Sequence, residues 1–151
     1  AIMRTESAYR PDAVSPVDAT GLMQIMPYTG RLISQAMKLK GHKHHLLFEP
    51  SHNLRMSGWY LRQVMNKFND QVPLVAAAYN GGPHRVARWL QRRGRGMLMD
   101  EFIEEIPFRQ SRLYAKKVIR LVALYERVHC GKDDMVLANK LVTTYKKFPT
   151  F

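Results

Sequence analysis

The sequence contains a single cysteine, Cys130, in 151 residues, so no disulfide can form within the chain. Free cysteine is among the most buried residue types, and we expect Cys130 to be a small, buried or half-buried hydrophobic side chain. It would act as a nucleophile only beside a histidine, and the sequence does not require that arrangement.

Long apolar runs and an N-terminal signal peptide are also missing. No run approaches the ~18 consecutive apolar residues of a membrane-spanning helix. The chain opens on Ala1-Ile2-Met3-Arg4 in what reads as the middle of a helix, so we expect a fragment of a longer protein. Its length predicts a single domain over residues 1–151.

Acidic residues are scarce, with 12 Asp and Glu against 24 Lys and Arg, which gives a net charge of +12. Such a surplus attracts polyanions, whether nucleic acid, an anionic membrane surface or an acidic wall polymer. The densest cluster is Arg92-Arg93-Gly94-Arg95. We interpret it as a solvated or wall-facing surface, and we expect no nucleic-acid partner.

A metal-binding pattern is lacking despite several histidines. His42-Lys43-His44-His45, followed by His52, does not have the spacing of a structural zinc site and has a lysine inside it. We therefore interpret this segment as a solvated loop and expect neither a metal ion nor a cofactor.

No strong strand signal appears, and apolar residues recur at helical spacing along most of the chain. The sequence predicts a mainly α fold with at most a short β hairpin near residues 15–21. The third expected helix carries a stripe that we expect to face the core, made of Leu54, Gly58, Leu61, Met65 and Phe68. The first expected helix ends near residue 9. The others cover about 27–37, 51–68, 72–80, 83–91, 100–106, 111–129 and, in the tail, 133–145.

Glu6 is the most informative single residue. It shares a helix face with the apolar Ile2 and Met3. A carboxyl in such surroundings is desolvated, which raises its pKa toward neutrality and lets it donate a proton at physiological pH. The pattern alone also fits a partly exposed glutamate paired with an arginine.

Two further segments place polar groups at helix ends. Gln24 stands between apolar neighbours just before Pro27, and Tyr79 and Asn80 precede Gly81. Polar groups at helix ends often face clefts. Each also has a structural explanation, with Gln24 as a helix-start cap, Asn80 as a C-cap and Tyr79 as a core residue. Trp59 and Trp89 lie on helical stripes, which favours core positions over sugar platforms.

Five motifs with these residues occur in order and resemble the signature set of the soluble lytic transglycosylases of Gram-negative bacteria. The resemblance covers about Ala1 to Val128 and leaves residues 129–151 as a C-terminal extension. The motifs are Glu6-Ser7-Ala8-Tyr9, Ser15-Pro16-Val17, Gly21-Leu22-Met23-Gln24-Ile25-Met26-Pro27, Ala78-Tyr79-Asn80-Gly81-Gly82-Pro83 and Phe102-Ile103-Glu104-Glu105-Ile106-Pro107-Phe108.

The resemblance implies a lysozyme-like α domain that binds peptidoglycan glycan strands, acts in the periplasm or cell envelope and works as a monomer. Glu6 is similar to the family's single catalytic acid/base. The residues similar to substrate-binding groups are Ser15, Gln24, Met26, Tyr79, Asn80, Glu104 and Tyr114.

The implied reaction is non-hydrolytic cleavage of the bond between N-acetylmuramic acid and N-acetylglucosamine, which leaves a 1,6-anhydro end. One carboxyl suffices because the nucleophile is the sugar's own hydroxyl, whereas ordinary glycosidases use two carboxyls. Asp18 decides between this and a hydrolytic muramidase, because a second carboxylate facing the cleft would permit hydrolysis. We interpret Asp18 as an exposed turn residue. A glycan- or nucleic-acid-binding module without catalysis is the alternative of another class.

Overall fold

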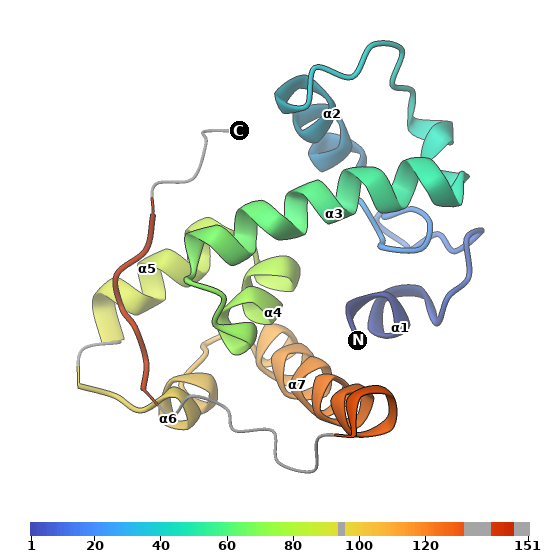
Figure 1. Cartoon of the computed structure of the whole chain (residues 1–151). Helices are drawn as coiled ribbons and strands as arrows, with labels where there is room; N and C mark the ends of the chain where they lie inside the picture. Colours follow the sequence, from blue (N-terminus) through green and yellow to red (C-terminus); the bar gives the residue numbers. More distant parts are fainter. Residues whose placement is uncertain (94–95, 132–139, 147–151) are drawn as a thin grey trace. The chain divides into compact units, whose positions relative to one another are not determined.

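The computed structural model describes residues 1–93, 96–131 and 140–146 (Figure 1). The expectation of a mainly α fold is confirmed, since the β structure of the described residues is limited to isolated bridges such as those pairing Thr20 with Val14 and Ile25. None of the described helices is both long and apolar enough to cross a membrane. The helices are α1 (Ile2–Ser7), α2 (Pro27–Ala36), the 3-10 helix η1 (His44–Phe48), α3 (Pro50–Lys67), α4 (Val72–Gly81), α5 (Pro83–Arg93), α6 (Met99–Glu104) and α7 (Arg109–Cys130).

Contacts divide the chain into two compact units, and α3 supplies residues to both. The first unit comprises Ile2–Arg62, and the second comprises Ala1 and the described residues from Gln63 to Lys146. In the first unit Ile33, Leu47 and Met56 are fully buried and form its apolar centre.

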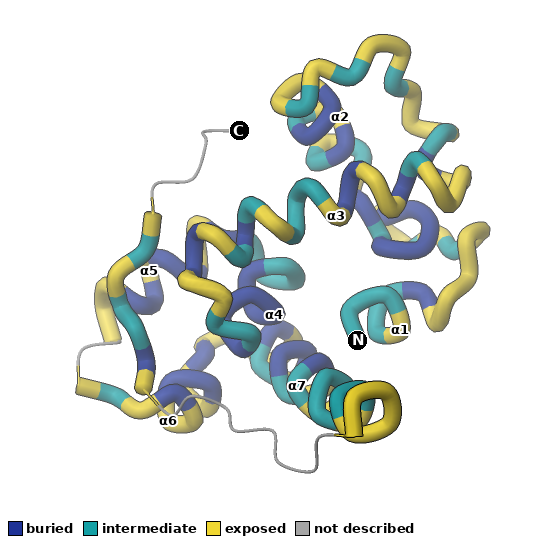
Figure 2. Tube along the Cα trace, viewed as in Figure 1, coloured by how far each residue is buried: buried dark blue, intermediate teal, exposed yellow. Residues whose placement is uncertain are grey.

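The second unit is built around α4, which packs against α5 and α7. All residues from Pro73 to Ala78 are buried, as Figure 2 shows for this helix. A proline in the first turn suits the helix start, and Gly82 at φ +90° ends the helix in a conformation that side chains rarely adopt. The predicted stop at Gly81-Gly82 and restart at Pro83 are therefore confirmed.

The predicted core stripe of α3 is wrong at its start. Leu54 is 41% exposed and Gly58 is also exposed, whereas Asn53, Met56 and Ser57 are buried. The stripe was predicted on the rule that polar side chains face solvent. Here the side chains of Asn53 and Ser57 are buried because they bond to backbone groups within the core. The stripe holds again at Phe68, which is fully buried.

The tail differs from the helix predicted over 133–145. Residues 132–139 lie outside the described residues, and 140–146 are not helical. Gln71 both donates to the Val142 carbonyl (3.0 Å) and accepts from the Val142 amide (2.8 Å). Asn69 donates to the Thr144 carbonyl, and Lys67 donates to the Lys146 carbonyl. The turn after α3 thus satisfies backbone groups that a helix would have paired internally.

Cys130 is exposed, which corrects the expectation of a buried or half-buried residue. It is the last residue of α7, where the whole final turn is exposed. The apolar face that packs the earlier part of this helix, including Tyr114 and Val118, has ended there.

Candidate active site

The loop between α1 and α2 is organised around Gly21 and the buried Asn53 of α3. The Asn53 amide donates to the carbonyls of Thr20 (3.1 Å) and Leu47 (2.8 Å), and its oxygen accepts the Met23 amide (3.1 Å). Gly21 has φ +75°. One fully buried side chain therefore fixes the backbone of the segment that carries Gln24 and Met26.

Glu6 lies on α1, which is tied to this loop through its neighbour. The Ser7 hydroxyl is buried and donates to the Leu22 carbonyl at 2.8 Å. Glu6 itself is half-buried. The other three acidic residues of the first unit, Asp12, Asp18 and Glu49, are exposed.

Three predicted substrate residues of the first unit sit in or beside the same loop. The Ser15 hydroxyl accepts the backbone amides of Val17 (3.3 Å) and Ala19 (3.0 Å) and closes a turn. Met26 is 39% exposed and is the N-cap residue of α2. All three predicted residues therefore belong to one short stretch of chain.

Gln24, the third of them, has the unusual φ of +49° for a non-glycine residue. Its amide nitrogen donates to the carbonyls of Ala13 and Gly21, both at 3.0 Å. This use of the nitrogen leaves Oε1 as the hydrogen-bond acceptor of the side chain. Gln24 is not the cap of α2, which has no side-chain cap.

Asp18 occupies an exposed turn with φ +62°. Its amide donates to the Ser15 carbonyl, and its carbonyl accepts the Thr20 hydroxyl at 3.0 Å. These bonds give the residue a backbone role, which agrees with its interpretation as a turn aspartate.

In the second unit Ser111 links Asn80 to α7, the helix that also carries Tyr114. The Ser111 hydroxyl donates to Asn80 Oδ1 at 2.9 Å, joining α4 to α7. Tyr114 follows three residues later on α7 and is 9% exposed, while Tyr79 and Asn80 are half-buried. Asn80 lies within α4 and is not its C-cap, since Gly82 holds that position.

Glu104 ends α6 and is exposed. Its carboxylate forms an ion pair with Lys116 of α7. Arg112 donates to the carbonyls of Glu104 and Ile106, both at 3.1 Å, and so fixes the connection between the two helices. A carboxylate held in this way keeps a defined position while remaining open to solvent.

Sequence reasoning missed two positioning residues, Asn53 and Ser111. Each is a small polar residue in a helix that buries its side chain, at 0% and 4% exposure. An asparagine is a poor helix former, and its presence inside the strongly helical 51–68 stretch was the available signal. Ser111 gave no comparable signal because it stands at a helix start, where serine is common.

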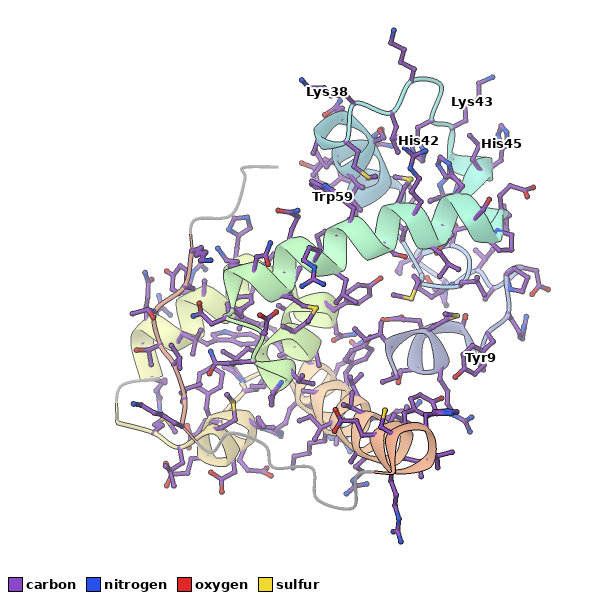
Figure 3. The ribbon with its side chains drawn as sticks, in the orientation of Figure 1. Tyr9, Lys38, His42, Lys43, His45 and Trp59 are labelled. Carbon is purple, nitrogen blue, oxygen red and sulfur yellow. The ribbon has the colours of Figure 1, made fainter. Side chains whose placement is uncertain are left out.

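Two histidines of the first unit, His42 and His52, form a pair. His42 Nδ1 and His52 Nε2 are 3.0 Å apart, and the planes of the two stacked rings are nearly parallel, with 5° between them. Figure 3 shows His42 turned toward α3 while Lys43 and His45 reach outward. Burial, followed by the nearby His52 and His44, lowers the pKa of His42. Among the described residues there is no group of three or more side chains that could hold a metal ion.

Comparison with known proteins connects these residues to a family. The model of the transglycosylase SLT domain matches residues 1–97. The chain is 36% identical over 140 residues to a putative soluble lytic murein transglycosylase of Haemophilus influenzae, covering 93% of this chain and 24% of that protein. It is 38% identical over 141 residues to the soluble lytic murein transglycosylase of Escherichia coli K12, covering 93% and 22%.

Solved structures share the fold. An inactive glutamate-to-glutamine mutant of the lytic transglycosylase Slt from Pseudomonas aeruginosa matches with a TM-score of 0.81 and 35% identity, covering 96% of this chain and 23% of that one. The 70-kDa soluble lytic transglycosylase in complex with bulgecin A matches with a TM-score of 0.82 and 33% identity, covering 98% and 24%. The chain thus spans about a quarter of the length of these relatives, and the expected lysozyme-like fold is confirmed.

Proposed function

Because the chain belongs to the transglycosylase SLT family, we propose that it is the catalytic domain of a lytic murein transglycosylase. Residues 1–151 act as one domain of a longer protein, and the substrate is the glycan strand of peptidoglycan. The domain works as a monomer in the periplasm or cell envelope, and its similarity to soluble and membrane-bound murein transglycosylases supports this.

One observation carries the choice of catalytic residue. Glu6 alone among the acidic residues of Ile2–Arg62 is withdrawn from solvent, and it sits on a helix that Ser7 ties to the Gly21–Met26 loop. Partial removal from water favours the protonated form of a carboxyl. The solved Pseudomonas relative, inactive after replacement of a glutamate by glutamine, supports a mechanism in which a glutamate is essential.

In the first step Glu6 donates its proton to the glycosidic oxygen between N-acetylmuramic acid and N-acetylglucosamine. The bond to the muramic acid C1 breaks, and the N-acetylglucosamine leaves with its hydroxyl restored. The N-acetyl oxygen of the muramic acid stabilises the positive charge that develops at C1.

In the second step the Glu6 carboxylate takes the proton of the C6 hydroxyl, whose oxygen attacks C1 and closes the 1,6-anhydro ring. The carboxyl returns to its starting state, and no water is consumed. An intramolecular nucleophile of this kind can have an effective molarity on the order of 10⁵ M or more, so a second carboxylate is not required.

The remaining residues bind and orient the strand. Gln24 Oε1 and the exposed Met26 contact sugars, Ser15 contributes a hydroxyl, and Glu104 meets the glycan or its peptide. In the second unit Tyr79, Asn80 and Tyr114 bind the N-acetyl group and the sugar that carries it. Their fixed positions, such as that of Asn80 beside Ser111, supply the preorganisation that catalysis needs.

Substitution of single glutamates tests whether Glu6 is the catalytic acid and whether the chain cleaves its substrate at all. Glu6→Gln is expected to abolish the loss of turbidity of a peptidoglycan suspension while the protein still co-sediments with it. Glu126→Gln, on α7, and Glu49→Gln, exposed in the first unit, serve as controls and keep their activity. An active Glu6→Gln would overturn the assignment, and loss of activity in Glu126→Gln would then point to the other half-buried glutamate. A parent chain that binds but never cleaves would favour a binding module.

A further inference from the structure

A pocket of about 600 Å³ lies in the second unit between α5 and the α6–α7 connection. This volume is within the range of small-molecule sites. Its walls come from α5, from the end of α6 and from the segment that precedes α7. The lining residues are Arg85, Arg88, Trp89, Arg92, Arg93, Phe102, Glu105, Ile106, Pro107 and Phe108.

Four of the lining residues are arginines, and only one is acidic. Arg93 is neutralised by Glu105 at 3.3 Å. Over the part of the chain that the structure describes, no carboxylate forms an ion pair with Arg85, Arg88 or Arg92. Three positive charges therefore remain around one pocket, more than a single carboxylate or a monoanionic phosphate diester balances.

The spacing of these arginines places them on one face. Arg85, Arg88 and Arg92 stand at i, i+3 and i+7 on α5, so their guanidinium groups follow one another along the helix. A guanidinium presents several N–H groups in a plane and matches the oxygens of a phosphoryl group in pairs. A ligand with two linked phosphoryl groups would meet successive arginines of this row.

The remaining walls are apolar and aromatic. The Arg85 guanidinium lies 5.3 Å above the Phe108 ring, and the Phe108 and Trp89 rings are 5.7 Å apart. Phe108 is 50% exposed although it is a large aromatic residue. The pocket thus offers an anion site beside an aromatic wall of two tilted rings, which suits a ligand whose charged end carries an apolar or planar body.

This pocket is separate from the residues that the proposed function uses. None of Ser15, Gln24, Tyr79, Asn80, Glu104 and Tyr114 lines it. Binding to it can therefore be measured without peptidoglycan, and the result does not depend on whether Glu6 is the catalytic acid.

We propose that the Arg85–Arg88–Arg92 face of α5 and the Trp89–Phe108 wall form a binding site for a diphosphate ester. The diphosphate bridges the three arginines, and the body attached to it rests against the aromatic pair. The Glu105 carboxylate repels the bound anion, and its ion pair with Arg93 reduces this repulsion.

The direct test is titration of the chain with inorganic pyrophosphate, followed by the fluorescence of Trp89 in a Trp59→Phe background, because the sequence has two tryptophans. Pyrophosphate is expected to bind at least tenfold more tightly than inorganic phosphate or citrate. Arg88→Gln and Arg92→Gln should each weaken it about tenfold or more, as loss of a charged hydrogen bond predicts. Arg120→Gln, an exposed arginine of α7 outside the pocket, removes the same charge and should change the affinity little.

Glu105→Gln gives a test of opposite sign, since it removes the only carboxylate of the pocket and should tighten pyrophosphate binding. Absence of pyrophosphate binding, equal binding of citrate, or an equal effect of Arg120→Gln and Arg88→Gln would each overturn the proposal. The source of the diphosphate is distinguished by geranyl diphosphate, with an apolar body, and ADP, with a planar one. If geranyl diphosphate or ADP binds more tightly than pyrophosphate, the role of the Trp89–Phe108 wall is supported. If neither does, that role is overturned.

Discussion

Gly21 and Asn53 approach so closely that no side chain fits between them. A Cβ added to Gly21 would lie 2.5 Å from Asn53 Nδ2 and would also collide with the Leu47 carbonyl oxygen. The same asparagine amide bonds to Thr20 and Leu47. The loop that carries Gln24 and Met26 thus depends on the absence of a side chain at one position and on a single polar side chain at another.

Replacement of Gly21 by alanine is expected to lower the free energy of unfolding by about 3 kcal/mol, because the clash adds to the strain of a positive φ. Gly41→Ala is the matched control. Its φ of +76° equals that of Gly21 within a degree, yet nothing lies within 4 Å of the added Cβ. Urea denaturation of both variants isolates the clash, and equal losses of stability would contradict it.

Asn53→Ala removes three hydrogen bonds and leaves the Met23 amide and the carbonyls of Thr20 and Leu47 without this partner. Loss of buried polar partners predicts a cost of about 3 kcal/mol or more in the free energy of unfolding. Asn66→Ala, at an exposed position of the same helix, should be neutral or slightly stabilising because alanine is the better helix former. Thermal unfolding that ranks the two variants equally would argue against the role of Asn53.

The His42–His52 pair predicts a pH dependence with a defined sign. The pKa of His42 is lowered from 6.5, so the folded state holds the neutral ring more firmly than the unfolded state does. The resulting stability is present above pH 6.5 and is lost as the pH falls below that value toward the folded pKa. His52→Gln should move the pKa of His42 back toward 6.5, because His52 contributes to the lowering.

NMR titration of the His42 ring protons measures this shift, and His129→Gln, at the exposed end of α7, is the control. An unchanged His42 pKa in His52→Gln would show that the two rings do not interact in solution.

The attachment of residues 140–146 depends on Gln71, whose amide holds both the N–H and the carbonyl of Val142. Gln71→Ala is expected to speed hydrogen exchange of the Val142 amide about tenfold or more, because it removes the acceptor of that proton. Gln91→Ala, exposed on α5, should leave the rate unchanged. Equal protection of Val142 in the parent and in Gln71→Ala would mean that another group holds the segment.

Helices with proline or glycine at their ends were predictable from the sequence. Pro27, Pro83 and the Gly81-Gly82 pair set boundaries through local backbone sterics, and α2, α4 and α5 begin or end where these residues stand. The mainly α class followed from the same helical periodicity.

Features that depend on distant partners were not predictable in this way. The core face of α3 was misplaced because the buried Asn53 bonds to Thr20 and Met23, which are distant in sequence and which local periodicity does not identify. The segment 140–146 is extended because Gln71, far away in sequence, pairs with its backbone. The order of the family motifs singled out Glu6 as the catalytic residue. The apolar pattern of its helix face alone also fitted a glutamate paired with an arginine at the surface. The roles of Ser15, Gln24, Met26, Tyr79, Asn80, Glu104 and Tyr114 stay predictions.

The central claim, cleavage by one carboxyl without water, is tested most directly by the mass of the soluble products. The chain is incubated with purified peptidoglycan in water enriched in heavy oxygen, and the fragments are analysed by mass spectrometry. The account predicts muropeptides with 1,6-anhydro ends, lighter by one water than the reducing forms and free of heavy oxygen. Reducing ends that carry the heavy isotope would show hydrolysis and would contradict the account.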